Sequence, residues 1–477
     1  MPFCQTHTQA KDIERGIFHG EPAPRDGHLH AKGRRMQDNN DSTFQTRRRL
    51  CVATATTLAA APLGLIGCSD GNKDMNEVAE KKEVSSSSTD LRPFTYKASD
   101  ADLADLRRRI ETARWPDRET VKDSSQGVQL ATIQKLAQHW ATKYDWRKIE
   151  SQINGYPNFM TTIDGLDFHF MHIKSKHEKA LPLLVAHGWP GSIIEQMKII
   201  GPLTDPTAHG GTEADAFHLV IPSMPGYGFS ARPTTTGWNP PRIADAYIAL
   251  MKRLGYAKWG AAGGDWGAIV VEMMALKTPP GLVGIHTNMA NCVPPDLDKA
   301  LFLGEPVPAS LTGEEKQAAD QLFAFYRHIG YAVLMGDRPQ TLTGLADSPV
   351  GLAAFMIDHD PVSQDMIARS ISGSPEGLTP DDVLDNVTLF WLTNTGVSSG
   401  RLYWENKSPF FAVKGVTIPV AVSAFPDELF QAPRSWAEKA YPKLVHYNRL
   451  PKGGHFAAWE QPKFYSEEVR AGFKTLR

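Results

Sequence analysis

Short apolar runs and helical stretches alternate along much of the chain from residue 156 onward. Residues 182–186 and 217–222 are short and mostly apolar, which is typical of buried strands. A third such run, 256–262, leads into an apolar helical stretch, 268–276, which is followed by two prolines that stop a helix. This alternation predicts an α/β fold with a mostly parallel sheet that is covered by helices on both faces.

The preceding segment, residues 92–155, has helical spacing of its apolar positions instead. Ser99 and Asp102 mark the start of a helix that we expect to run to Arg114, and a second helix is expected over 128–144. No catalytic grouping occurs in this segment. We therefore predict an N-terminal helical meander that packs over the domain that follows it.

After residue 292 the alternation of strands and helices stops. Helical spacing recurs over 313–328, 363–370 and 379–393, and strand-like runs return only at 416–424 and later at 444–447. A block of helices inserted this late in an α/β fold predicts a lid over the sheet. The expected organisation is a targeting region 1–68, a flexible linker 69–91, a meander 92–155, a first core part 156–292, a helical lid 293–410 and a second core part 411–477.

The first 68 residues carry the features of a bacterial export signal. Arg48 and Arg49 precede an apolar run over 50–67, and the run ends in Leu65-Ile66-Gly67-Cys68. A twin arginine before such a run is similar to a Tat signal, and the end of the run resembles a lipobox. We expect export to the periplasm or anchoring to the membrane by a lipid on Cys68, with Met36 as an alternative start. A signal cut elsewhere or an uncleaved anchor stays open.

Composition excludes several classes of protein. Lys plus Arg number 51 and Asp plus Glu number 53, whereas nucleic-acid-binding domains carry a basic excess. The four cysteines form no C-x-x-C pair, so a structural zinc site is not expected. If Cys68 becomes the lipidated N-terminus, Cys292 is the sole remaining thiol and no intrachain disulfide can form. No motif for a metal, nucleotide or flavin is present, and we expect no cofactor.

The chemistry is expected at Asp265. This residue is the centre of the sequence GGDWG at 263–267, which follows a predicted strand and begins a helix. A nucleophile between glycines on such a turn is the nucleophile elbow of α/β-hydrolases. Asp in place of Ser or Cys changes the predicted reaction from acyl to alkyl transfer, since a carboxylate is already ionised at neutral pH.

Further site residues follow other predicted strands. The loop HGWP at 187–190 is typical of an oxyanion hole, so the backbone N–H groups of Trp189 and Trp266 are expected to face the nucleophile. His455 lies in a glycine-rich loop after the last strand and is the expected general base. The acid that orients His455 is expected between Asp265 and His455 in the sequence, and both Asp427 and Glu428 qualify. We assign no chemistry to Asn288.

Taken together, these motifs resemble an epoxide hydrolase of the microsomal type, over residues 92–477. The N-terminal meander is also a feature of that family. The matching stretches are HGWPGS at 187–192, SMPGYGFS at 223–230, GGDWG at 263–267, DSPVGL at 347–352, SAFP at 423–426 and GGHFAA at 453–458.

The resemblance implies roles for three further residues. It favours Glu428 over Asp427 as the acid, because the spacing to His455 matches the family. It also implies that two lid tyrosines hold the epoxide oxygen and supply a proton. Their matching positions are Tyr403 and Tyr331, with Tyr326 as a rival for the second.

The implied reaction converts a small apolar epoxide and water to a vicinal diol through a covalent ester on Asp265. Two alternatives remain at this point. A haloalkane dehalogenase uses the same ester chemistry but needs a halide cradle in place of paired acids. A non-catalytic homologue would bind ligands in the same pocket without turning them over.

Overall fold

The computed structural model describes residues 91–477. The predicted twin-arginine signal, the alternative start Met36, the lipidation site Cys68 and the linker up to residue 90 lie outside the described residues. Within residues 91–477, no helix combines the length and apolar character needed to cross a bilayer.

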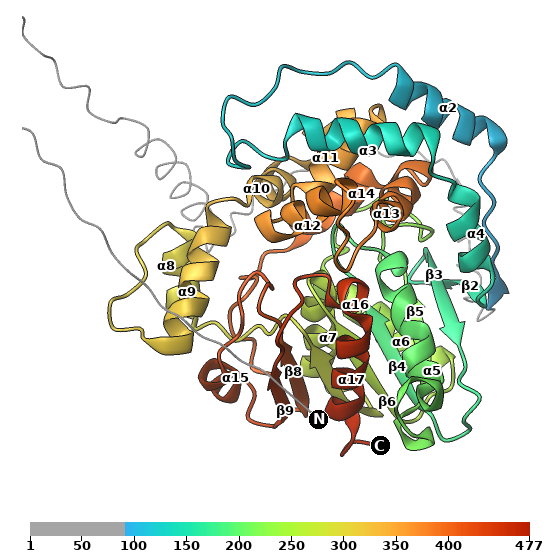
Figure 1. The fold of residues 1–477 in the computed structure, drawn as a ribbon. Coiled ribbons are helices and arrows are strands. Elements are labelled where there is room, and N and C mark those ends of the chain that lie inside the picture. The colour runs from blue at the N-terminus through green and yellow to red at the C-terminus, as the bar shows by residue number, and fades with distance from the viewer. Residues whose placement is uncertain (1–90) are drawn as a thin grey trace, which may run out of the picture. The chain divides into compact units, whose positions relative to one another are not determined.

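A nine-stranded sheet forms the centre of the described region (Figure 1). The strand order is β1-β2-β3-β5-β4-β6-β7-β8-β9, and pairing is antiparallel from β1 to β5 and parallel from β5 to β9. The predicted mostly parallel sheet is therefore confirmed. The strands are β1 (Arg92–Pro93), β2 (Asn158–Ile163), β3 (Leu166–Ile173), β4 (Leu181–Ala186), β5 (Phe217–Pro222), β6 (Trp259–Gly263), β7 (Leu282–Thr287), β8 (Val420–Ala424) and β9 (Leu444–Arg449).

Helices cover both faces of this sheet. Crossovers between parallel strands are right-handed, so the helix between β4 and β5 lies opposite to those that lead from β5 to β6 and from β6 to β7. Accordingly α17 packs on α5, while α6 and α7 pack on each other. The core helices are α5 (Ile200–Thr204), α6 (Pro240–Arg253), α7 (Trp266–Lys277), α15 (Arg434–Ala440), α16 (Ala457–Glu460) and α17 (Pro462–Phe473), with the 3-10 helices η1 (Ile193–Ile199), η2 (Pro206–His209) and η3 (Glu213–Asp215).

The N-terminal meander contains α2 (Asp100–Glu111), α3 (Leu130–Thr142) and α4 (Trp146–Asn154). The Ser99 hydroxyl accepts a hydrogen bond from the Asp102 N–H and caps α2, as predicted. The helix ends three residues earlier than Arg114. α2 and α3 lie over lid helices rather than over the sheet (Figure 1).

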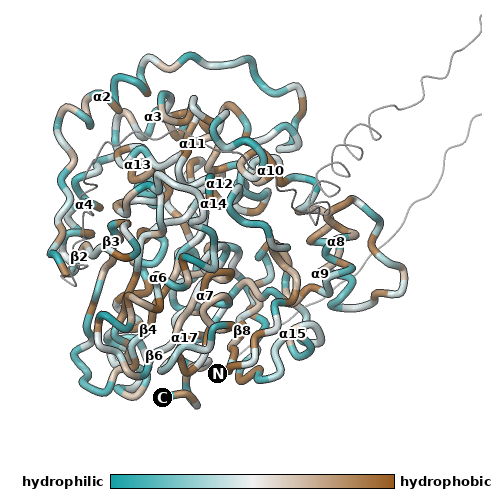
Figure 2. The backbone as a smooth tube through the Cα atoms, turned by 180° about the vertical axis from the view of Figure 1, so that it is seen from behind, coloured by the Kyte–Doolittle hydropathy of each residue, from teal (hydrophilic) through white to brown (hydrophobic). Residues whose placement is uncertain are grey.

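The chain between β7 and β8 forms a helical block, in agreement with the predicted helical insertion. Its helices α10 to α14 lie beyond the carboxyl ends of the parallel strands (Figure 1). Brown, hydrophobic segments of the chain gather along the central strands beneath (Figure 2). The helices are α8 (Pro295–Phe302), α9 (Gly313–Tyr326), α10 (Gly330–Asp337), α11 (Pro349–Ile357), α12 (Pro361–Ile371), α13 (Pro380–Leu392) and α14 (Gly396–Glu405), with the 3-10 helix η4 (Pro339–Ala346).

Candidate active site

Asp265 occupies a sharp turn between β6 and α7. Its φ of 48° and ψ of −130° lie outside the regions that L-residues prefer, and such strain is typical of functional turns. Gly267 allows the turn to be this tight, because a Cβ there would lie 2.1 Å from the Ala186 carbonyl oxygen. The strand therefore delivers a buried carboxylate to the carboxyl edge of the sheet.

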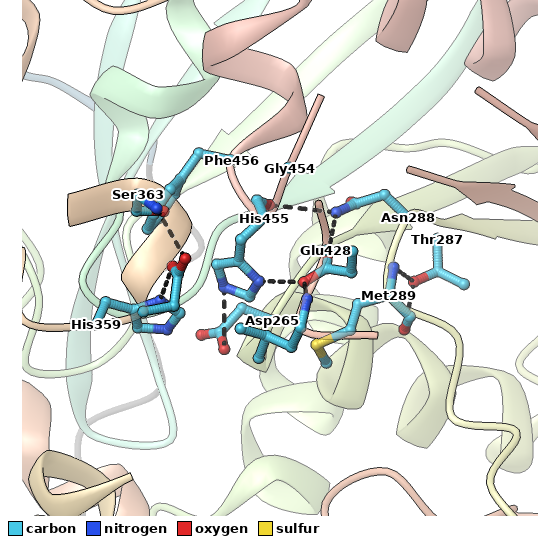
Figure 3. A network of polar contacts seen from close by, with 12 residues as sticks. Asp265, Thr287, Asn288, Met289, His359, Ser363, Glu428, Gly454, His455 and Phe456 are labelled. Carbon is cyan, nitrogen blue, oxygen red and sulfur yellow. Dashed lines mark hydrogen bonds and ion pairs between the residues drawn. The ribbon is translucent and has the colours of Figure 1, made fainter. Parts of the chain in front are cut away.

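Three strands bring the predicted nucleophile, acid and histidine together at this edge (Figure 3). Asp265 follows β6, Glu428 follows β8 and His455 follows β9. The His455 Nδ1 atom contacts Glu428 Oε1, and its Nε2 atom lies 3.6 Å from Asp265 Oδ2. The rival acid Asp427 is exposed, and its backbone N–H donates to the Gly453 carbonyl. Glu428 is thus the carboxylate in contact with the imidazole.

Glu428 is held by two further donors. Its Oε2 atom accepts a hydrogen bond of 3.0 Å from Asn288 Nδ2, and its Oε1 atom accepts one of 2.9 Å from the Leu429 N–H. Asn288 follows β7 at the same edge of the sheet, and the sequence analysis gave it no role. Its position directly after the short, mostly apolar run Leu282–Thr287 was the signal that could have placed it beside the acid.

The two predicted backbone donors lie against the Asp265 carboxylate. The Trp189 N–H donates to Asp265 Oδ1 at 2.6 Å, and the N–H of Trp266, the next residue in the chain, lowers the pKa of the same carboxylate. Gly188 makes the contact between Trp189 and Asp265 possible, because a Cβ at residue 188 would lie 2.1 Å from Asp265 Oδ1. One carboxylate oxygen is therefore held by the backbone, while the other faces His455.

The lid places Tyr331 and Tyr403 above this arrangement. The Tyr331 ring stacks on Trp189 with centroids 5.0 Å apart, and the Tyr403 ring meets Trp266 edge-on at 4.7 Å. Burial and the charge of Asp265 both raise the pKa of each phenol well above its ordinary value. The two phenols are therefore protonated at neutral pH and close enough to Asp265 to sense its charge.

The rival tyrosine lies elsewhere in the lid. The Tyr326 hydroxyl donates to Asp298 Oδ1 at 2.5 Å, within the pair formed by α8 and α9. The structure thus brings Tyr331, and not Tyr326, to the tryptophans beside the nucleophile.

The charged groups of the site shift one another's pKa values. Burial alone would raise the pKa of Asp265, but the nearby His455 and His359 rings and the backbone N–H of Trp266 together lower it. Burial opposes protonation of His455, yet Glu428 and Asp265 raise its pKa well above the ordinary value. The nucleophile is consequently ionised, and the imidazole beside it holds its proton tightly.

His359 is a site residue that the sequence analysis missed. It lies between α11 and α12, and its ring stacks on that of His455 with centroids 4.5 Å apart (Figure 3). Donor atoms of Asp265, His359 and His455 all lie within 4.8 Å of one another, close enough to hold a metal ion. A histidine flanked by two aspartates in the middle of the lid was the available signal.

The described part of the chain also contains a cleft of about 1480 Å³. The loop over 225–238, the segment over 337–346 and the last turns of α14 line it. Asp265 is not among its lining residues, so we do not identify this cleft with the reaction site.

Comparison with known proteins agrees with this geometry. A family model described as "Epoxide hydrolase N terminus" matches residues 91–196, and one described as "alpha/beta hydrolase fold" matches residues 182–324. A protein named "Putative epoxide hydrolase" from Stigmatella aurantiaca is 49% identical over 81% of this chain and 86% of its own length. "Epoxide hydrolase 1" of Oryctolagus cuniculus is 35% identical over 80% of this chain and 88% of its own length.

Two solved structures have the same fold over most of their length. The crystal structure of juvenile hormone epoxide hydrolase from the silkworm Bombyx mori superposes with a TM-score of 0.72 at 30% identity, over 82% of this chain and 96% of that one. The structure of Aspergillus niger epoxide hydrolase superposes with a TM-score of 0.68 at 27% identity, over 82% of this chain and 98% of that one. Sequence, fold and site geometry agree, and the chain belongs to the epoxide hydrolases of the microsomal type, α/β-hydrolase enzymes that add water to an epoxide.

Proposed function

We propose that Asp265 opens apolar epoxides as a covalent nucleophile and that His455, oriented by Glu428, directs water to hydrolyse the resulting ester. The contact that carries this proposal is the 3.6 Å approach of a buried, ionised carboxylate to an imidazole that a second carboxylate holds. A hydrolase that attacked with activated water alone would not need a carboxylate at the elbow.

Ring opening begins at Asp265 Oδ2. The Oδ1 atom is bound by the Trp189 N–H, which leaves Oδ2 as the attacking atom. As the new C–O bond forms, the epoxide C–O bond breaks and its electron pair stays on the epoxide oxygen. Tyr331 or Tyr403 donates a proton to that oxygen, since an alkoxide is too basic to leave unaided.

Ester hydrolysis uses the other half of the site. His455 takes one proton from water, and the hydroxide adds to Cγ of Asp265. Negative charge then develops on Oδ1, where the Trp189 N–H already points, and one such donor typically lowers a barrier by about 3 kcal/mol. The Trp266 N–H is the second donor of this oxyanion hole. Collapse releases the diol with the proton from His455, and the proton of the added hydroxyl returns to the phenolate.

The walls of the site support an apolar substrate. Trp189 and Trp266 place aromatic rings against the two phenols, and Phe410 packs on Trp266. These rings favour apolar substituents on the epoxide, while the phenols supply the polar contact to its oxygen.

His455→Gln tests this function directly. With styrene oxide, the variant should form the ester and hydrolyse it slowly, so that mass spectrometry finds an adduct on the peptide that contains Asp265. Asp265→Asn is the matched control and should carry no adduct. Styrene oxide converted to diol by wild type without an adduct in His455→Gln would contradict the ester pathway. Release of chloride from 1-chlorobutane without conversion of styrene oxide would favour a haloalkane dehalogenase. Binding of either compound without turnover would favour a non-catalytic ligand-binding protein.

We also propose that the chain is exported and anchored by a lipid on Cys68. The twin arginine and the Leu65–Cys68 stretch support this. Cells that express the full chain should incorporate labelled palmitate into wild type but not into Cys68→Ala. Equal labelling of both would contradict lipidation at this residue.

A further inference from the structure

A second histidine–carboxylate pair faces the nucleophile from the lid. His359 Nδ1 lies 2.9 Å from Asp360 Oδ2, and both side chains are buried. Asp360 is itself fixed, because its Oδ1 atom accepts the Ser363 N–H at 2.8 Å and caps α12. The end of a lid helix therefore sets the orientation of the His359 ring.

This pair repeats the arrangement of His455 and Glu428. In each pair a carboxylate engages Nδ1, so a neutral imidazole carries its proton there and presents a lone pair at Nε2. Among residues 91–477, neither Nε2 atom has a hydrogen-bond partner, and both atoms are buried. The rings are stacked at 4.5 Å with an angle of 30°, and one atom of each lies within 4.8 Å of an Asp265 oxygen.

Once Asp265 is esterified, two unpartnered Nε2 atoms near it match the needs of a water molecule that attacks the ester. Water that attacks an ester must turn its oxygen toward the carbonyl carbon and its two hydrogens away from it. A single base fixes one hydrogen and leaves the other free to rotate. A second acceptor removes that freedom, and correct orientation of a reactant can account for several kcal/mol of a barrier.

We propose that His359 is the second acceptor for the hydrolytic water, an inference that rests on the ester mechanism proposed above. His455 Nε2 receives one hydrogen and removes it as a proton when the oxygen adds to Cγ of Asp265. His359 Nε2 accepts a hydrogen bond from the other hydrogen, which stays on the added hydroxyl. His359 gains no proton in this step, and the balance of the reaction is unchanged.

The role is confined to the second half of the reaction. The phenols of Tyr331 and Tyr403 serve ring opening, whereas His359 faces the carboxylate from the side of His455. His359 also packs against Tyr331, with ring centroids 5.2 Å apart. A test must therefore separate loss of the acceptor from loss of packing.

His359→Phe keeps a ring between Tyr331 and His455 and removes the acceptor. With styrene oxide in rapid-quench experiments, ester formation should stay within about twofold of wild type, while ester hydrolysis slows by about 10- to 100-fold, because a misplaced reactant can cost about 100-fold in rate. Because the ester accumulates, kcat and KM should fall together and leave kcat/KM unchanged. A purely structural role would lower kcat/KM as well.

Two further variants sharpen the test. His359→Gln keeps an acceptor oxygen and should restore part of the lost hydrolysis rate. Asp360→Asn keeps the helix cap but can donate to Nδ1, which places the proton on Nε2 and removes the lone pair, so it should slow hydrolysis as His359→Phe does.

The possible results separate this inference from the ester mechanism. Ester that forms and hydrolyses at the wild-type rate in His359→Phe would overturn the inference and leave the mechanism standing. A parallel loss of kcat and kcat/KM would also overturn it, in favour of packing. Failure to detect ester in any variant, His455→Gln included, would overturn both.

Discussion

Gly188→Ala should disable the nucleophile without touching a catalytic side chain. A Cβ at this residue would lie 2.1 Å from Asp265 Oδ1 and 2.4 Å from Asp265 Cβ, closer than non-bonded atoms approach. The carboxylate must then move by about 1 Å, and a misplacement of this size costs about 100-fold in rate. The move also breaks the 2.6 Å bond from the Trp189 N–H, a donor worth about 3 kcal/mol. Since both effects act on one atom, we expect a loss of about 10³-fold in kcat/KM, or ~4 kcal/mol.

Steady-state and single-turnover kinetics with styrene oxide would measure this loss. Gly344→Ala is the matched control, because a Cβ there meets no atom within 4 Å, and its kinetics should equal those of wild type. Circular dichroism and thermal unfolding would show whether each variant is folded. A folded Gly188→Ala protein with kcat/KM within tenfold of wild type would refute the placement of Asp265 against this loop.

Three further predictions follow from the site. Glu428→Gln should slow ester hydrolysis by roughly 10²- to 10⁴-fold, whereas Asp427→Asn should leave it unchanged, as measured by ester decay after rapid mixing. Tyr403→Phe should slow ester formation by about 10-fold or more, while Tyr326→Phe should leave that rate unchanged and lower the melting temperature, because Asp298 loses a buried hydrogen bond. The folded-state pKa of His455 is raised, so its protonation stabilises the protein fully below about pH 6.5 and this stability is lost as pH rises through the folded-state value. The difference in melting temperature between wild type and His455→Gln, measured from pH 5 to 10, should therefore shrink toward high pH, and a growing difference would contradict the ion-pair assignment.

Much of the site follows from one topological fact. Trp189, Asp265 and His455 each follow a parallel strand, and the carboxyl ends of parallel strands meet at one edge of the sheet. Strands are recognisable from short apolar runs, so the sequence suffices to predict that these residues converge. Asn288 obeys the same rule, and its place beside Glu428 was within reach of the same reasoning.

The pattern of the sequence alone could not decide between Asp427 and Glu428. The two carboxylates are adjacent in one turn after β8, and only the turn geometry decides which is buried against His455 and which is exposed. Spacing to the histidine, taken from the family resemblance, favoured the residue that the structure brings into contact.

The lid shows a different limit of prediction from sequence. α11 is apolar nearly all round, because it packs between the meander helices on one side and α13 on another. A helix buried on several sides has no polar face, so periodicity did not predict it. His359 follows Asp358, the C-terminal cap of this helix, and its approach to His455 depends on how the whole lid docks. Residues that reach a site from such a block need the tertiary structure.

The same geometry links the two halves of the reaction through charge. In the free protein, the charge of Asp265 is one of the interactions that raise the pKa of His455, so a protonated imidazole beside an ionised nucleophile is the favoured state. That state suits ring opening, which needs a carboxylate and no base. Once the ester forms, Asp265 is neutral, and of the two carboxylates that contact His455, Glu428 alone continues to raise its pKa. The imidazole then gives up its proton more readily and can act as a base. At a separation of 3.6 Å, esterification of the nucleophile thus prepares the base that the next step requires.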